Sequence, residues 1–152
     1  MCIRDRIGYV KGAYVKHYRE DLEKDEAIFR QMVVRTAQSY LGTQYRWGGK
    51  SSYGIDCSGL CSMAYLLNGV IIFRDSHIEQ GFPIHQIAYE KLAIGDLLFF
   101  KGHVAMWLGN NKIIHSTAKK GREGVVIDSI DRNNPNARLD LWDIYQMCGS
   151  LF

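Results

Sequence analysis

The sequence has no long apolar run, only two prolines and little excess of either charge. A membrane-spanning helix needs about 20 apolar residues, whereas apolar runs such as Val70–Phe73 and Leu97–Phe100 have the length of single strands. The scarcity of proline and the 47% of hydrophobic residues argue against a disordered chain. A chain of 152 residues suits one globular domain that can bury a hydrophobic core.

Strong net charge is also missing. The 19 Lys and Arg side chains are nearly balanced by 16 Asp and Glu side chains, which leaves a formal net charge of +3. These charges are spread along the chain, so the sequence does not predict a nucleic-acid partner, although it would not repel an anionic polymer. We expect a monomer with no membrane span.

Cysteines are few and irregularly spaced. Cys2, Cys57, Cys61 and Cys148 do not form the pattern of a disulfide framework, and no pair has the spacing of a zinc ribbon. The cysteine spacing therefore predicts no zinc ribbon, and the thiol chemistry considered below requires neither a metal nor an organic cofactor. Cys61 and Cys148 are interpreted as small apolar core residues, which is the common role of a buried free cysteine.

Helical patterns occupy the first half of the chain. From Glu20, apolar residues recur at steps of three and four and Gly42 offers a stop, which predicts a helix with an inner face of Ile28, Phe29, Met32, Val33, Ala37 and Leu41. A second helix is predicted from about residue 56 to residue 68. Its inner face would consist of Leu60, Cys61, Ala64 and Leu67.

The second half reads as short strands separated by turn residues. Strands are predicted at Leu97–Phe100, Val104–Leu108, Ile113–Ser116 and Val125–Ser129, with a last one at Ile144–Leu151. Because helices come first and strands follow, we expect an α+β fold with an antiparallel sheet.

Cys57 begins the second predicted helix, directly after a loop rich in glycine. A helix N-terminus stabilises a thiolate through its free N–H groups and its dipole, and the same N–H groups can bind an oxyanion. Gly59 would leave room for a substrate. The alternative is that Cys57 is a packed core thiol, but the flanking Asp56 and Ser58 make burial less attractive.

Two histidines lie on the strands that would pair beside this helix. If Gly109-Asn110-Asn111 forms a three-residue loop, His115 lies opposite Ala105 and one diagonal step from His103, on the same face of the sheet. A two-residue turn would send the histidines to opposite faces. His103 can then act as the base for Cys57, with His115 orienting its ring. The other histidines, His17, His77 and His85, are interpreted as ordinary surface residues.

Five motifs occur in a characteristic order along the chain: Tyr45–Gly49, Asp56–Gly59, Gly95–Phe100, Gly102–Val104 and Ile114–His115. This arrangement resembles the NlpC/p60 family of papain-like cysteine peptidases, which hydrolyse bacterial cell-wall stem peptides, and covers the chain from Ile28 to its end. The resemblance implies Cys57 as nucleophile, His103 as base and His115 as the orienting residue.

The subgroup with the greatest resemblance is that of the γ-D-glutamyl-L-diamino acid endopeptidases. It implies that Tyr45 lies near the oxyanion site and that the pocket for an L-Ala-γ-D-Glu end is lined by Trp47, Asp56, Ser58, Asp75 and Ser76. Asp56 or Asp75 could pair with a free ammonium group. Each also has an ordinary alternative: Asp56 as a helix cap, Trp47 as a core residue and Asp75 as a turn residue. Asp96 is interpreted as structural.

In such enzymes an N-terminal Src-homology-3-like barrel precedes the catalytic domain. Gly8–Lys16 alternates like a strand and resembles the last strand of that barrel, while Met1–Arg6 resembles a translated adapter fragment. We therefore expect residues 1–19 to be an artefact followed by a remnant of a truncated barrel, and residues 20–152 to be the catalytic domain. The lack of a signal-peptide pattern then says little about localisation.

The resemblance implies an endopeptidase that cleaves the bond between γ-D-Glu and diaminopimelate or lysine through a thioester on Cys57. Its substrate would be a stem peptide or muropeptide, outside the cytoplasm or in the wall, or during cytoplasmic recycling of muropeptides. Two alternatives stay open: an amidase or acyltransferase acting on another amide or ester, and a wall-binding module without catalysis.

Overall fold

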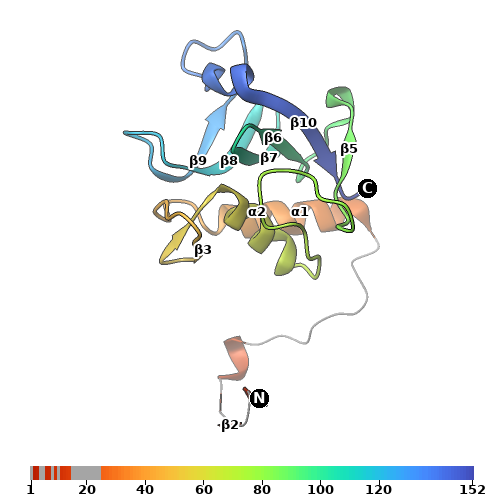
Figure 1. Ribbon diagram of the computed structural model, residues 1–152, viewed down its shortest axis with the longest axis vertical. Coiled ribbons are helices and arrows are strands. Elements are labelled where there is room, and N and C mark those ends of the chain that lie inside the picture. Colours follow the sequence, from red (N-terminus) through yellow and green to blue (C-terminus); the bar gives the residue numbers. More distant parts are fainter. Residues whose placement is uncertain (1, 4–5, 8, 10, 15–24) are drawn as a thin grey trace.

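Two helices, α1 and α2, lie together on one side of a six-stranded sheet (Figure 1). The computed structural model describes residues 2–3, 6–7, 9, 11–14 and 25–152. Helix α1 (Glu26–Gln38) begins where the carboxylate of Asp25 accepts a hydrogen bond from the Ile28 N–H at 3.1 Å. In this described part no helix is long and apolar enough to cross a membrane. The helix-then-strand order confirms the predicted α+β fold.

The buried face of α1 differs from the predicted one. Phe29, Val33 and Ala37 are buried as expected, but Ile28 and Leu41 are exposed. Arg30, a charged residue one position after Phe29, is buried in their place. Hydrophobic periodicity misplaced this edge of the helix because Arg30 finds buried partners that only the tertiary structure supplies.

Helix α2 (Cys57–Leu66) starts one residue after the predicted start, with Asp56 as its N-cap, and ends two residues before the predicted end. Leu60, Cys61 and Ala64 form its buried face, whereas Leu67 is exposed and Tyr65 is buried instead. The helix packs against α1 on one side and against the strands β7 (His103–Gly109) and β8 (Lys112–Thr117) on the other. This packing fixes the position of its N-terminus relative to the sheet.

All neighbouring strands of the sheet are antiparallel, in the order β5-β10-β6-β7-β8-β9. Their bounds are β5 (His85–Ile87), β6 (Leu97–Phe100), β7 (His103–Gly109), β8 (Lys112–Thr117), β9 (Gly124–Ser129) and β10 (Tyr145–Ser150). The five strands that the sequence predicted are therefore present, while β5 was not predicted. Two small pairs complete the described strands: β1 (Cys2–Ile3) with β2 (Arg6–Ile7), and β3 (Lys50–Ser51) with β4 (Gly54–Ile55).

Both faces of the sheet are covered, which explains the unbroken apolar run of β6. Leu97 and Phe99 face the core between the sheet and the helices. Leu98 and Phe100 belong to a second core on the opposite face. That face also receives Leu141 from the 3₁₀ helix η3 (Leu139–Ile144), and Tyr89 of the 3₁₀ helix η2 (Tyr89–Lys91) packs against it.

The expected strand at Gly8–Lys16 is not seen in the described part of this segment. Gly12–Tyr14 forms a 3₁₀ turn, η1, instead. The remainder of the prediction falls largely outside the described residues. The proposed division into a barrel remnant and a catalytic domain therefore stays a prediction.

The hairpin between β7 and β8 reaches the predicted register by a different route. The turn has two residues, Asn110 and Asn111, both with positive φ, and Gly109 pairs with Lys112. A two-residue turn alone would send the histidines to opposite faces, but a β-bulge between Trp107 and Gly109 shifts the pairing by one residue. Met106 then pairs with Ile114, and the same register extended places Ala105 opposite His115. The predicted loop was wrong and the predicted register is confirmed.

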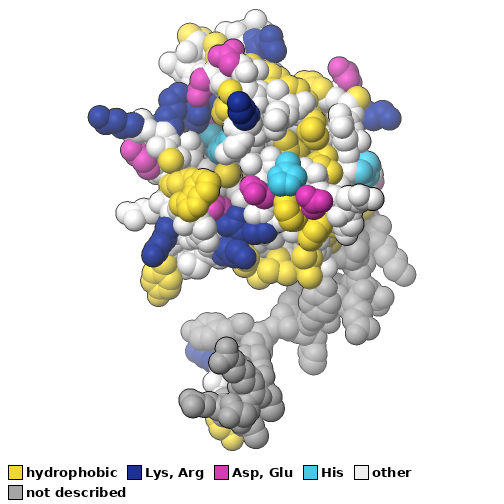
Figure 2. Space-filling view, viewed as in Figure 1, with side chains coloured by type: hydrophobic (Ala, Val, Ile, Leu, Met, Phe, Trp, Pro, Cys, Tyr) yellow, Lys and Arg dark blue, Asp and Glu magenta, His cyan; other side chains and the backbone are white. Residues whose placement is uncertain are grey.

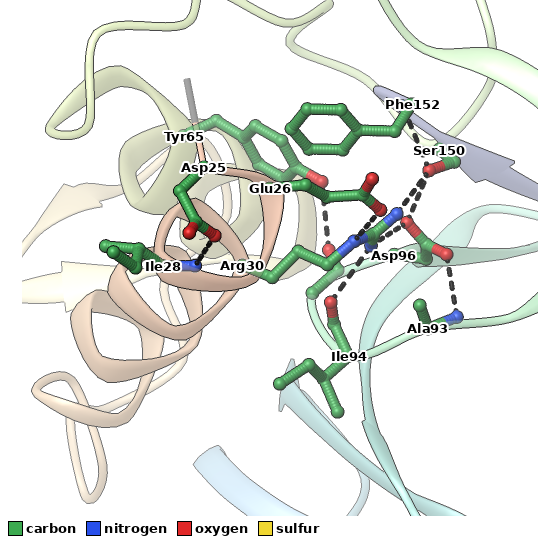
Figure 3. Close-up of polar contacts among 11 residues, drawn as sticks. Asp25, Glu26, Ile28, Arg30, Tyr65, Ala93, Ile94, Asp96, Ser150 and Phe152 are labelled. Carbon is green, nitrogen blue, oxygen red and sulfur yellow. Dashed lines mark hydrogen bonds and ion pairs between the residues drawn. The ribbon is translucent and has the colours of Figure 1, made fainter. Parts of the chain in front are cut away.

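A buried polar network ties α1 to the sheet (Figure 3). The Arg30 guanidinium donates to Asp96 Oδ1 at 2.6 Å, to the Ile94 carbonyl at 3.0 Å and to Ser150 Oγ at 3.1 Å. Ser150 Oγ also donates to Asp96 Oδ1, and the Ala93 N–H donates to Asp96 Oδ2. Asp96 is thus structural, as the sequence indicated.

This network predicts a large difference between two substitutions around one guanidinium. Replacing Arg30 by Met leaves Asp96 buried without its cation, so we expect the free energy of unfolding to fall by about 3–5 kcal/mol. The control is Glu26→Gln, which removes an exposed partner of the same guanidinium and is expected to change stability by at most about 1 kcal/mol. Urea denaturation of both variants measures this, and equal losses would contradict the network's role.

Candidate active site

Cys57 occupies the first position of α2 and belongs to the core between the two helices and the sheet. The residue is only 7% exposed. The N–H groups at the first turn of a helix have no partner within the helix, so the backbone of Cys57 and Ser58 presents donors at this end. The tip can therefore hold a developing negative charge.

The carboxylate of Asp56 fixes this helix tip. Its Oδ1 accepts from the Gly59 N–H at 2.7 Å, which is the expected N-cap, and its Oδ2 accepts from the Gly48 N–H at 2.7 Å. Arg74 also donates to Oδ1 at 2.8 Å. Both oxygens are used by the protein itself, so the structure favours the capping role over pairing with a substrate ammonium group.

Gly59 is needed for close packing inside the protein. A Cβ at this position would lie 2.3 Å from the Gly49 carbonyl oxygen. The sequence had suggested that Gly59 makes room for a substrate, but the backbone of the preceding loop occupies that space.

Arg74 was missed by the sequence analysis. It follows Phe73 in a connecting segment with no periodic signal, yet its guanidinium donates to Ser58 Oγ, to Asp56 and to the Gly49 carbonyl. Its Nε is buried and has no hydrogen-bond partner among the described residues. Arg74 thus joins the loop before α2, the first turn of α2 and the segment that carries Asp75.

The pairing of β7 with β8 runs from the turn as far as Met106 and Ile114. Before that point, His103, Val104 and Ala105 pair with β6. The backbone N–H of Val104 faces the sulfur of Cys57. The sulfur therefore lies beside the residue that follows His103, at the place where β7 and β8 separate.

The structure corrects one expectation about the thiol. Burial raises the pKa of Cys57 above its ordinary value, and the nearby Asp56 carboxylate acts in the same direction. The backbone N–H groups of Val104, Ser58 and Cys57 lower the pKa but do not outweigh burial. The helix N-terminus was expected to produce a thiolate, whereas in the free protein the neutral thiol is the favoured form.

The predicted histidine pair is present. His103 Nε2 lies 2.7 Å from His115 Nδ1, and the ring centroids are 5.0 Å apart. His115 is fully buried, and its Nε2 lies 3.0 Å from Asp128 Oδ2. The three side chains form one hydrogen-bonded row that ends at a buried carboxylate.

Asp128 was also missed by the sequence analysis. It lies on β9, where Val126 pairs with His115 and Asp128 pairs with Ile113. A single carboxylate inside an otherwise apolar strand, on the same face as His115, is the signal that could have identified it. Arg122 forms an ion pair with Oδ1, and Arg138 approaches Oδ2 at 3.5 Å.

The charges around this row favour neutral histidines. Burial lowers the pKa of His103 to about 3, and His115 and Arg138 act in the same direction. Burial also lowers the pKa of His115, which outweighs its hydrogen bond with Asp128. Burial opposes ionisation of Asp128, but the hydrogen bond from His115 and the two arginines hold the pKa of this carboxyl below its ordinary value.

A cleft of about 340 Å³ opens beside Cys57. Five of the six predicted substrate-binding residues line it, namely Trp47, Asp56, Ser58, Asp75 and Ser76. Gly102 and the exposed Lys50 lie on its wall as well. On the face shown in Figure 2, basic and acidic side chains are interspersed with hydrophobic ones, so the surface carries both signs of charge.

The predicted cleft residues differ in their exposure and in whether their polar atoms already have hydrogen-bond partners. Trp47 is 84% exposed and is not a core residue. Asp75 is exposed; its Oδ1 accepts from the Ser76 N–H at 2.7 Å, and its Oδ2 accepts no hydrogen bond from the described residues. Tyr45, the sixth residue, is half-buried. Burial raises the pKa of its phenol, and the electrostatic influence of Cys57 and Asp56 acts in the same direction, which places the phenol near both.

The other candidate residues take the roles that the sequence assigned to them. Cys61 and Cys148 are buried core thiols. His77 is exposed and pairs with Glu79, and His85 is exposed on β5, whereas His17 lies outside the described residues. Among the described residues no group of three His, Cys, Asp or Glu side chains is placed to hold a metal ion.

The raised pKa of Cys57 predicts the pH dependence of its alkylation. Only the thiolate reacts with iodoacetamide, so we expect the labelling rate to rise through and above the pH range of a free thiol, whose pKa is about 8.5. Mass spectrometry after timed labelling measures the rate, and Cys57→Ala provides the background from the other cysteines. A rate that is already constant below neutral pH would contradict a thiol held neutral.

Comparison with known proteins gives consistent matches. The NlpC/P60 family matches residues 42–141. Dipeptidyl-peptidase 6 of Lysinibacillus sphaericus is 51% identical over 146 residues, which are 96% of this chain and 53% of the relative. The gamma-D-glutamyl-L-lysine dipeptidyl-peptidase of Bacillus cereus is 38% identical over 92 residues, which are 55% of this chain and 27% of that protein.

Among solved structures, the NlpC/p60 domain of the peptidoglycan hydrolase SagA aligns with a TM-score of 0.60 and 30% identity. The alignment covers 80% of this chain and 97% of that domain. The chain spans about half the length of dipeptidyl-peptidase 6. With the motifs, the fold and the helix-tip cysteine in agreement, this chain belongs to the NlpC/P60 family.

Proposed function

We propose that this chain is a cysteine peptidase domain that cleaves bacterial cell-wall stem peptides between γ-D-Glu and the following diamino acid, diaminopimelate or lysine. The observation that carries the proposal is the position of Cys57, at a capped helix tip in a cleft and beside the strand residue that follows His103. The names of the relatives, a dipeptidyl-peptidase and a gamma-D-glutamyl-L-lysine dipeptidyl-peptidase, support this substrate class.

In the first half of the reaction an imidazole nitrogen of His103 takes the thiol proton as the sulfur of Cys57 attacks the γ-D-Glu carbonyl carbon. Because burial favours a neutral thiol on Cys57 and a neutral imidazole on His103, proton transfer would accompany attack. The carbonyl oxygen becomes an oxyanion, which the backbone N–H groups at the start of α2 can stabilise, with the Tyr45 hydroxyl as a further donor. Collapse breaks the C–N bond, and His103 gives its proton to the leaving amine.

In the second half water hydrolyses the thioester. His103, neutral again, takes a proton from the water as its oxygen attacks the thioester carbon. Loss of the sulfur releases the γ-D-Glu carboxylic acid, and the proton on His103 returns to Cys57. Throughout, His115 orients the ring of His103 through the hydrogen bond of 2.7 Å between His115 Nδ1 and His103 Nε2. This cycle consumes one water and needs no metal or organic cofactor.

The cleft also offers a means of selecting chain ends. Asp56 is occupied by Gly48, Gly59 and Arg74, so Asp75 is the carboxylate available to a free ammonium group of an L-Ala-γ-D-Glu end. The enzyme would act on wall fragments outside the cytoplasm, or on muropeptides during recycling.

The chemistry is tested with a defined L-Ala-γ-D-Glu-diamino-acid peptide and mass spectrometry of the products. We expect cleavage on the carbonyl side of the diamino acid, and a fall of kcat by at least about 10³-fold for Cys57→Ala or His103→Ala, because both groups take part in bond formation. Cleavage that survives Cys57→Ala, or products from a different bond, would remove the proposal. Cys61→Ala is the matched thiol control and should retain turnover.

Chain-end selection is tested by pairing Asp75→Asn with an acetylated peptide, which lacks the ammonium group. For the free peptide we expect KM to rise by about tenfold or more with kcat little changed, as for the loss of a charge-assisted hydrogen bond. For the acetylated peptide, wild type and Asp75→Asn should have equal KM values. Glu79→Gln, which changes a neighbouring carboxylate that does not line this cleft, is the control. An unchanged preference in Asp75→Asn would exclude Asp75 as the ammonium site.

A further inference from the structure

Asp128 is a charged side chain that the proposed reaction does not use directly. It is only 4% exposed and lies behind the fully buried His115, one residue further from the substrate than any group in the mechanism. Burying a carboxylate is unfavourable unless hydrogen bonds and opposite charges compensate. The chain supplies both, from His115 on one side and from Arg122 and Arg138 on the other.

An ionised carboxylate can only accept hydrogen bonds, so the proton between Asp128 and His115 must be on His115 Nε2. A neutral imidazole carries one proton, which leaves His115 Nδ1 as an acceptor. The bond of 2.7 Å between the rings therefore requires the proton of His103 to be on Nε2. The remaining nitrogen of His103, Nδ1, is then free of a proton.

We propose that Asp128 is the positioning residue that fixes the tautomers of both histidines, so that His103 Nδ1 is the nitrogen that accepts the proton of Cys57. This inference rests on the proposed role of Cys57 and His103. Without Asp128 either tautomer of His115 is available, and the wrong one makes His103 a donor toward the thiol.

Arg122 and Arg138 keep His115 neutral by compensating the charge of Asp128. A buried carboxylate alone would favour a protonated His115, which would donate from both nitrogens and force His103 into the wrong tautomer. Arg122 and Arg138 compensate the charge of Asp128, and Asp140 in turn pairs with Arg138 at 2.8 Å. The charged and titratable groups that act on His115 are Asp128, Arg122 and Arg138. Those that act on His103 are His115, Arg138 and Asp140, and those that act on Asp128 are His115, Arg122 and Arg138.

Asp128→Asn is the direct test. Arg122 faces Oδ1 of the carboxylate, so the amide oxygen should take that place and the NH₂ group should face His115 Nε2. His115 Nε2 must then accept, its proton moves to Nδ1, and His103 is left with the proton on Nδ1. We expect kcat to fall by on the order of 10³-fold with KM little changed, by the same tautomer argument that applies to the aspartate of a Ser-His-Asp triad.

The histidine tautomers provide a measurement that a merely structural role of Asp128 would leave unchanged. Nitrogen-15 NMR of the histidine rings, without substrate, should show the Nε2–H form for His103 and His115 in the wild type. Both should show the Nδ1–H form in Asp128→Asn. Asp131→Asn, a nearby carboxylate that caps the turn at Asn133, should keep the wild-type pattern and activity. An Nδ1–H form of His115 in the wild type, or unchanged tautomers and kcat in Asp128→Asn, would overturn the inference.

Arg122→Gln gives a second test that does not alter the buried row, because the arginine side chain is half-exposed. Loss of this cation leaves Asp128 to favour protonation of His115, so the acid limb of kcat/KM should move to higher pH, by about one unit. An acid side of the kcat/KM profile that stays at the wild-type pH would contradict the compensating role of Arg122. The NMR pattern requires no turnover, so a wild type with these tautomers that fails to cleave the peptide would refute the proposed function while leaving the tautomer assignment intact.

Discussion

The carboxylate of Asp56 is the contact on which the geometry of the reactive end depends. It caps α2 through the Gly59 N–H, holds the preceding loop through the Gly48 N–H, and pairs with Arg74 from the segment after α2. Three pieces of chain that are separate in sequence therefore meet at one side chain. The position of Cys57, one residue later, follows from this arrangement. A residue that both caps and anchors has little freedom to serve as a substrate ligand as well.

The second constraint is the separation of β7 and β8 at the level of Ala105. A fully paired ladder would occupy the backbone N–H of Val104 within the sheet, but here this group faces the sulfur of Cys57. The β-bulge near the turn corrects the parity of the hairpin, so that His103 and His115 meet on one face. A bulge and a two-residue turn thus achieve what a longer loop would have achieved.

Burial gives the site its electrostatic character. It raises the pKa of Cys57 and lowers the pKa of both histidines, so the thiol and the two imidazoles are uncharged in the free protein. Uncharged groups suit these buried positions, where separated charges would be unfavourable. The charged groups nearby are instead arranged in compensated sets: Asp56 with Arg74, and Asp128 with Arg122 and Arg138.

The sequence by itself determined the α+β class, the start of α2 near Cys57, five strands of the sheet and the two histidines, because these follow from local periodicity, capping and motif order. It did not identify Arg30, Arg74 or Asp128. Arg30 and Asp128 are buried and Arg74 is partly buried, each against a partner distant in sequence, at Asp96, His115 and Asp56 respectively. Only the tertiary structure decided those pairs, and with them the use of Asp56 as an anchor and the neutral state of the thiol, since desolvation and long-range charge pairing arise only once the chain is packed.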